Sequence, residues 1–68
     1  MITYDPLKET LKLLGLELKD LEVDNGGVLN KRTVSKLRHN RTVNIESIER
    51  VCLFLDVPIE EVVEIRPD

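Results

Sequence analysis

The run Asn25-Gly26-Gly27 constrains the fold of this 68-residue chain more than any other feature. Asparagine followed by two glycines favours a turn, and glycine inside a helix or strand is destabilising. The chain must therefore reverse near this point, and only short elements fit on either side. A domain of this length buries only about 60% of the surface that its unfolded chain exposes, so its helices must pack efficiently or a second subunit must help.

Apolar side chains recur at helical spacing on both sides of this turn. The pattern predicts five short helices, over residues 6–14, 17–24, 31–38, 45–55 and 59–64. Asp5, Asn30 and Asn44 stand where a side-chain oxygen can cap a helix N-terminus, and Gly15 is expected to end the first helix in the left-handed conformation. We therefore expect an all-α fold, a compact bundle of five short helices that forms a single domain over residues 1–68.

The predicted core consists of leucine, valine and isoleucine side chains, with one cysteine. The inward positions are expected to be Leu7, Leu11, Leu14, Leu18, Leu21, Leu29, Val34, Leu37, Ile45, Ile48, Val51, Cys52, Leu55, Ile59 and Val62. At the two ends of the chain, residues 2–4 and 63–65 can pair as two short strands. Ile2, Tyr4, Val62 and Ile65 exceed what one short terminal helix buries, so they either complete the core of a monomer or form the seam of a homodimer.

One cationic segment lies within an otherwise acidic chain. Residues 31–41, KRTVSKLRHNR, hold five of the ten Lys and Arg residues, the one histidine and no acid, and so carry +5. Residues 1–30 carry −3 and residues 42–68 carry −5. This distribution directs positive potential at phosphates while the rest of the surface repels them, which favours a DNA-binding helix. The scarcity of aromatic residues argues against a surface that stacks single-stranded bases.

A helical wheel predicts which side chains of this segment face outward. When the buried side is placed at Val34 and Leu37, the outward face holds Arg32, Ser35, Lys36 and His39. Arg32, Ser35 and Lys36 can donate to base edges in the major groove. Phosphate contacts are expected at the two ends of the helix, from Asn30 with the backbone amides at the start and from Arg38, His39 and Arg41 at the far end.

The order of helix, glycine turn, helix and two further helices resembles the small Cro and phage-repressor type (XRE-like) of helix-turn-helix transcriptional regulator. The resemblance covers nearly the whole chain and is carried by TYDPLKETLKLLGL, LKDL, TVSKLRHN and VNIESIERVCLFLDVPIEEVVEI. It implies a lambda-repressor-like fold whose third helix lies in the major groove, which gives Lys31, Arg32, Ser35 and Lys36 the base-reading roles. The chain departs from the usual pattern at Leu18, at Glu22 and in a longer turn, all ahead of the third helix.

Catalytic and metal-binding functions find little support. One cysteine excludes an internal disulfide, and with one histidine it makes a zinc site implausible. The sequence shows neither a nucleophile–base pair nor a phosphate-binding loop, so we expect no enzyme activity, cofactor or metal. No apolar run approaches the length of a membrane span and no signal-peptide pattern opens the chain, so we expect a cytoplasmic protein.

Two hypotheses about function remain. The leading one is a sequence-specific transcriptional regulator that binds double-stranded DNA as a homodimer, with a recognition helix over about residues 31–39. The alternative is a protein-interaction module on a helix-turn-helix scaffold, such as an antirepressor or antitoxin-like partner of a regulatory protein, with weak or no DNA binding. The net charge of −3 and the pI near 5.1 favour the alternative.

Overall fold

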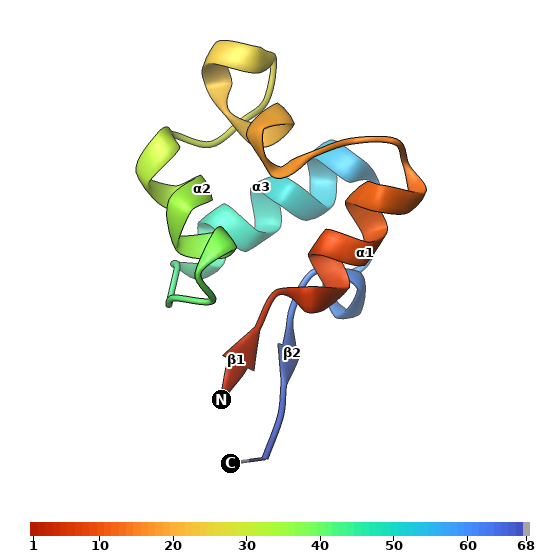
Figure 1. Ribbon diagram of the computed structural model, residues 1–68, viewed down its shortest axis with the longest axis vertical. Coiled ribbons are helices and arrows are strands. Elements are labelled where there is room, and N and C mark those ends of the chain that lie inside the picture. The colour runs from red at the N-terminus through yellow and green to blue at the C-terminus, as the bar shows by residue number, and fades with distance from the viewer. Residues whose placement is uncertain (68) are drawn as a thin grey trace.

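The computed structural model describes residues 1–67, in which short helices surround one apolar core. The three α-helices in this part of the chain are α1 (Asp5–Leu13), α2 (Lys31–Arg38) and α3 (Ile45–Leu55). In Figure 1, α3 runs across the middle of the molecule, with α2 on one side and α1 on the other. Three short 3-10 helices complete the helical part, η1 (Leu18–Leu21), η2 (Val23–Asn25) and η3 (Ile59–Glu61).

Three of the five predicted short helices are α-helices, but the number five is not confirmed, because the second element divides into η1 and η2 and the fifth is reduced to η3. Between η1 and η2 the chain passes through Glu22 in an extended conformation, with φ −75° and ψ 141°. There the carbonyl of Leu21 accepts hydrogen bonds from the amides of Val28 and Leu29 instead of continuing a helix. The fifth element ends at Glu61, and residues 64 and 65, of which 64 was predicted to be helical, form a strand.

That strand confirms the predicted pairing of the two chain ends. β1 (Ile2–Thr3) and β2 (Glu64–Ile65) form an antiparallel pair in which Ile2 lies opposite Ile65. Figure 1 shows both termini at the same end of the molecule. The fold is thus mostly helical with a two-stranded sheet rather than all-α.

The predicted core is largely confirmed. The buried apolar side chains are Tyr4, Leu7, Leu11, Leu21, Leu29, Val34, Leu37, Ile48, Val51 and Val62, and Leu18, Cys52 and Leu55 pack against them at the edge. Leu14, Ile45 and Ile59 were predicted to face inward and are instead exposed by 51%, 68% and 47%. Leu14 caps α1 where the chain turns away through Gly15, at φ +74°, which confirms the predicted left-handed stop. Ile45 and Ile59 are the first residues of their helices and project beyond the core.

The four terminal apolar residues differ in how far they are buried. Tyr4 is 2% exposed and Val62 is fully buried, so both complete the core of a single chain. Because these two side chains leave at most 2% of their surface exposed, the apolar surface available to a second subunit comes mainly from the other two residues. Ile2 and Ile65 remain exposed, by 37% and 80%.

Two of the three predicted helix caps are confirmed. The Oδ1 atoms of Asn30 and Asn44 each accept a 2.8 Å hydrogen bond, from the amides of Thr33 and Ser47 respectively. Asp5 was predicted to cap α1 but lies inside that helix as its first residue. The hydroxyl of buried Thr3 accepts from the Asp5 amide at 3.2 Å and takes over part of that role.

Candidate nucleic-acid interface

The cationic helix α2 is held by its apolar side and by the turn that precedes it. Val34 is fully buried and Leu37 is 1% exposed, as the helical wheel predicts, and α2 packs against η1. η1 and η2 take the place of the first helix of a helix-turn-helix unit, and α2 follows them as the second. The position of α2 relative to the rest of the molecule thus depends on residues 26–30.

The glycine turn is fixed by backbone hydrogen bonds rather than left as a loose loop. The Gly27 amide donates to the Glu22 carbonyl at 2.8 Å, and the Val28 and Leu29 amides both donate to the Leu21 carbonyl at 2.9 Å. A Cβ atom at Gly27 would lie 2.1 Å from the backbone carbon of Leu21, so no larger residue fits without moving the chain. The longer turn, which departs from the pattern of the family that the sequence resembles, therefore forms a defined connection between η2 and α2.

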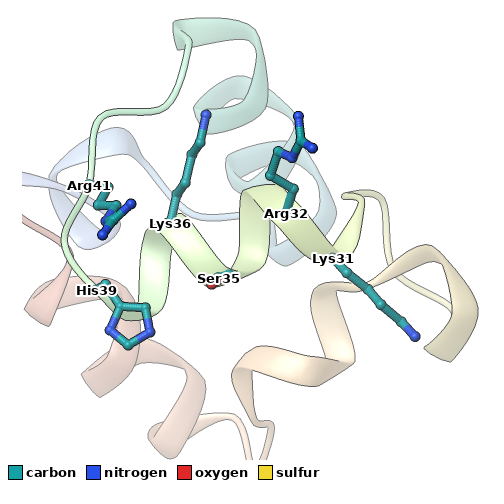
Figure 2. Close-up of a pocket in the computed structure, with 6 residues that line it drawn as sticks. All are labelled: Lys31, Arg32, Ser35, Lys36, His39 and Arg41. Atoms are coloured by element: carbon teal, nitrogen blue, oxygen red, sulfur yellow. The ribbon is translucent and has the colours of Figure 1, made fainter.

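The outward side of α2 forms an open hollow, here called the cationic face. Its lining residues are Lys31, Arg32, Ser35, Lys36, His39 and Arg41. Figure 2 shows Arg32, Ser35 and Lys36 along the middle of the helix, with Lys31 and His39 toward its two ends and Arg41 in the loop that follows. The four residues that the helical wheel predicts to face outward all lie on this face, and all four are exposed.

The charges of the cationic face are hardly neutralised by the rest of residues 1–67. Of the six side chains, Lys31 has an ion-pair partner, Asp24, with Nζ and Oδ2 3.8 Å apart. Both side chains are about three-quarters exposed, so this long pair contributes little to stability and opens readily. Within the described residues no carboxylate pairs with Arg32, Lys36 or Arg41, and their charge remains available to an anionic ligand.

The structure separates the predicted phosphate-contacting residues into two groups. His39 and Arg41 lie on the cationic face beside the predicted base-reading residues. Arg38 lies outside its lining, where its carbonyl accepts a 3.3 Å hydrogen bond from Lys8 Nζ. Asn30 uses Oδ1 to cap α2 and lines a smaller neighbouring hollow together with Glu22 and Asp24.

Two residues that the sequence analysis did not assign to the site shape the far end of α2, although Asn40 was expected to end the helix. Asn40 adopts the left-handed conformation, with φ 55°, and its Oδ1 accepts a 3.0 Å hydrogen bond from the Tyr4 amide. The Tyr4 hydroxyl donates to the Arg41 carbonyl at 2.8 Å. The sequence signal for Asn40 was its place after a helix, since asparagine tolerates this conformation better than most residues. No local pattern links Tyr4 to a residue 36 positions away.

The described residues offer little else that could carry chemistry. Among residues 1–67, no three His, Cys, Asp or Glu side chains gather into a group that could hold a metal ion. None of the helices in this part of the chain is long and apolar enough to cross a membrane. Burial raises the pKa of the Cys52 thiol, which fits a side chain at the edge of the core.

Comparison with known proteins identifies the family. The family model for the Cro/C1-type HTH DNA-binding domain matches residues 6–68, nearly the whole chain. A search of curated proteins and a search of solved structures found no match. The match includes the fixed turn, α2 and the cationic face. The chain therefore belongs to the Cro/C1-type helix-turn-helix DNA-binding family and is a DNA-binding regulator.

Proposed function

We propose that the protein is a sequence-specific transcriptional regulator that inserts α2 into the major groove of double-stranded DNA. The observation that carries this proposal is the cationic face, which gathers three Lys and Arg side chains along one exposed side of the eight-residue helix, with His39 at its end and Arg41 in the loop that follows. A major groove about 12 Å wide admits such a helix, and its base edges present acceptors to the donors on this face.

Base reading is assigned to Lys31, Arg32, Ser35 and Lys36. Arg32 lies on the middle of the exposed side and can give a bidentate pair of hydrogen bonds to guanine. Ser35 has a short side chain, so it suits the point of closest approach between helix and bases. Lys31 must release Asp24 to take part, at little cost because both groups are solvated.

Phosphate contacts are assigned to Asn30, Arg38, His39 and Arg41. The amides of the first turn of α2 and the positive end of the helix dipole favour a phosphate beside Asn30. At the other end, His39 and Arg41 share the cationic face with the base-reading residues, and Arg38 is the exposed last residue of α2. Such contacts fix the helix in the groove but carry no sequence information themselves.

We further propose that the regulator acts as a homodimer. An apolar groove beside the terminal sheet, here called the terminal groove, is lined by Ile2, Tyr4, Val43, Ile45, Ile48, Ile59, Val63 and Ile65. Ile45 and Ile65 are its most exposed members, and a two-stranded sheet also has free edges that a second copy can pair with. A two-fold dimer would present two α2 helices to half-sites about 34–36 Å apart. Sedimentation of Ile65→Glu against the unchanged protein tests this, and an unaltered oligomeric state would contradict it.

Titrations against duplex DNA at several salt concentrations test the roles of the arginines. Arg32→Ala should cost about 1–3 kcal/mol on a duplex with a selected binding site and little on mixed sequence, whereas Arg41→Ala should weaken both alike. Arg50→Ala is the matched control, because it removes one exposed arginine from α3, outside the cationic face. Equal losses for Arg32→Ala on both duplexes would contradict the base-reading role.

The protein-interaction module remains the second candidate, and the exposed side chains of the terminal groove favour it. Failure to bind any duplex at low salt, together with a stable complex with another protein, would support it over the DNA-reading role.

A further inference from the structure

We infer that Tyr4 is a positioning residue for DNA binding, which holds the turn after α2 so that Arg41 is ready to contact a phosphate. The inference rests on the proposed phosphate role of Arg41. It adds to that role a residue near the N-terminus, inside the core and outside the cationic face.

Tyr4 contacts both residues of this turn. Its amide donates to Asn40 Oδ1 at 3.0 Å, and its hydroxyl donates to the Arg41 carbonyl at 2.8 Å. Tyr4 is 2% exposed and joins β1 to α1, so it is itself held firmly on both sides. A tyrosine hydroxyl is protonated and able to donate at neutral pH, and burial raises the pKa of this one further.

The turn itself closes α2 with the hydrogen bonds of a Schellman motif. The Arg41 amide donates to the Lys36 carbonyl at 2.8 Å, and the Asn40 amide donates to the Leu37 carbonyl at 3.3 Å. Glycine is the usual residue at the left-handed position of this motif. Asparagine here provides the same conformation and adds the oxygen that the Tyr4 amide requires.

Arg41 is consequently fixed through its backbone on both sides. Its amide is held by Lys36 and its carbonyl by Tyr4, while its side chain is exposed on the cationic face. Only the side chain then loses freedom when a phosphate binds, and reducing the number of groups ordered on binding improves affinity. Without the Tyr4 hydroxyl, the carbonyl side of Arg41 would lose its partner and would also have to be ordered at that step.

A double-mutant cycle tests this coupling on a duplex of mixed sequence, which needs no knowledge of the operator. Arg41→Ala should weaken binding and reduce the slope of log affinity against log salt by about 0.9, as expected for one lost phosphate contact. Tyr4→Phe should weaken binding by about two- to tenfold, the range that one hydrogen bond supports. In the Arg41→Ala background, Tyr4→Phe should cause no further loss, because its effect passes through Arg41.

Two further variants separate positioning from general stability. Thr10→Val removes an equivalent hydroxyl-to-carbonyl bond, from Thr10 to Glu61 at 2.8 Å, where α1 meets η3. It should leave DNA affinity unchanged. Asn40→Gly keeps the left-handed backbone but removes the acceptor of the Tyr4 amide, so it should weaken binding as Tyr4→Phe does. Circular dichroism under the binding conditions establishes that each variant is folded.

The possible results distinguish failure of the positioning role of Tyr4 from failure of the proposed phosphate role of Arg41. Full affinity of both Tyr4→Phe and Asn40→Gly, with Arg41→Ala weakened, overturns the inference and leaves the phosphate role of Arg41 intact. The inference is also overturned if Tyr4→Phe reduces DNA affinity by the same factor in the Arg41→Ala background as in the unchanged protein. It is overturned as well if Thr10→Val reduces DNA affinity as much as Tyr4→Phe does. If Arg41→Ala binds like the unchanged protein, both the phosphate role and the inference fail, whereas failure of the unchanged protein to bind any duplex contradicts the proposed function itself.

Discussion

Replacement of Gly27 by alanine should disrupt the connection that places α2. The added Cβ atom would lie 2.1 Å from the backbone carbon of Leu21, 2.2 Å from its oxygen and 2.6 Å from the oxygen of Asp20. Carbon atoms in contact ordinarily lie about 3.5–4.0 Å apart, so the two backbone segments must separate by more than 1 Å, roughly the difference between these values. All three neighbours are backbone atoms, which cannot rotate away as a side chain can.

The loss of folding free energy can be estimated from the hydrogen bonds that are stretched when these two backbone segments separate. The amides of Gly27, Val28 and Leu29 all donate across the same gap, to the carbonyls of Glu22 and Leu21. Each such bond contributes about 1 kcal/mol, so their weakening together with the clash should lower the free energy of unfolding by about 3 kcal/mol or more. For a domain of this size that corresponds to a fall of about 12–24 °C in the thermal midpoint.

Gly26→Ala is the matched control for this experiment. Gly26 has φ +87° and an added Cβ would meet no atom within 4 Å, so only the left-handed backbone is penalised, by about 1–2 kcal/mol. Thermal unfolding followed by circular dichroism compares the two variants with the unchanged protein. A Gly27→Ala midpoint at or above that of Gly26→Ala would refute the reasoning.

Three further predictions concern the caps and the buried titratable groups. Asn44→Ala should lower the free energy of unfolding, measured by urea titration, by about 1 kcal/mol, because the Ser47 amide in the first turn of α3 loses its acceptor. An unchanged urea midpoint would contradict the capping role of Asn44. Cys52 should react with a thiol reagent more slowly in the folded protein than in denaturant, since burial raises its pKa and lowers the thiolate fraction; equal rates would contradict this. Burial also raises the pKa of Tyr4 above its ordinary value of 10.0, so the folded state holds that proton more tightly than the unfolded state. The stabilisation that results is fully present below about pH 10 and is lost as the pH rises through the folded pKa. In urea titrations from about pH 9 to 11, the free energy of unfolding should therefore fall more steeply with pH for the unchanged protein than for Tyr4→Phe.

The sequence was sufficient to predict α2 and its orientation because the information there is local. Val34 and Leu37 mark the buried side of the helix. Because residues 31–41 contain no acid, the outward side can only be cationic. The Asn30 and Asn44 caps were predictable for the same reason, since each bonds to an amide three residues away. The pairing of the chain ends could be suggested from two short apolar runs, but its register depended on the packed structure.

The remaining features depend on contacts between distant residues. Leu18 and Leu21 have the spacing of a helix, yet the Leu21 carbonyl bonds to the turn, and 3-10 geometry results. From the sequence, Tyr4 was one of several apolar residues near the chain ends that exceeded what a short terminal helix could bury. In the structure it is buried in the core, and its hydroxyl bonds to the turn after α2. Neither outcome follows from periodicity, because each is decided by a hydrogen bond that forms only after the chain has folded.

The central claim, that the cationic face reads bases, is tested most directly by selecting binding sites from randomised duplexes. The selection is run in parallel with the unchanged protein and with Arg32→Ala, and the preferred bases are compared position by position. The account predicts that Arg32→Ala loses its preference at one position in each half-site and keeps the others. Identical preferences for the two proteins would show that Arg32 does not read a base and would contradict the placement of this face in the major groove.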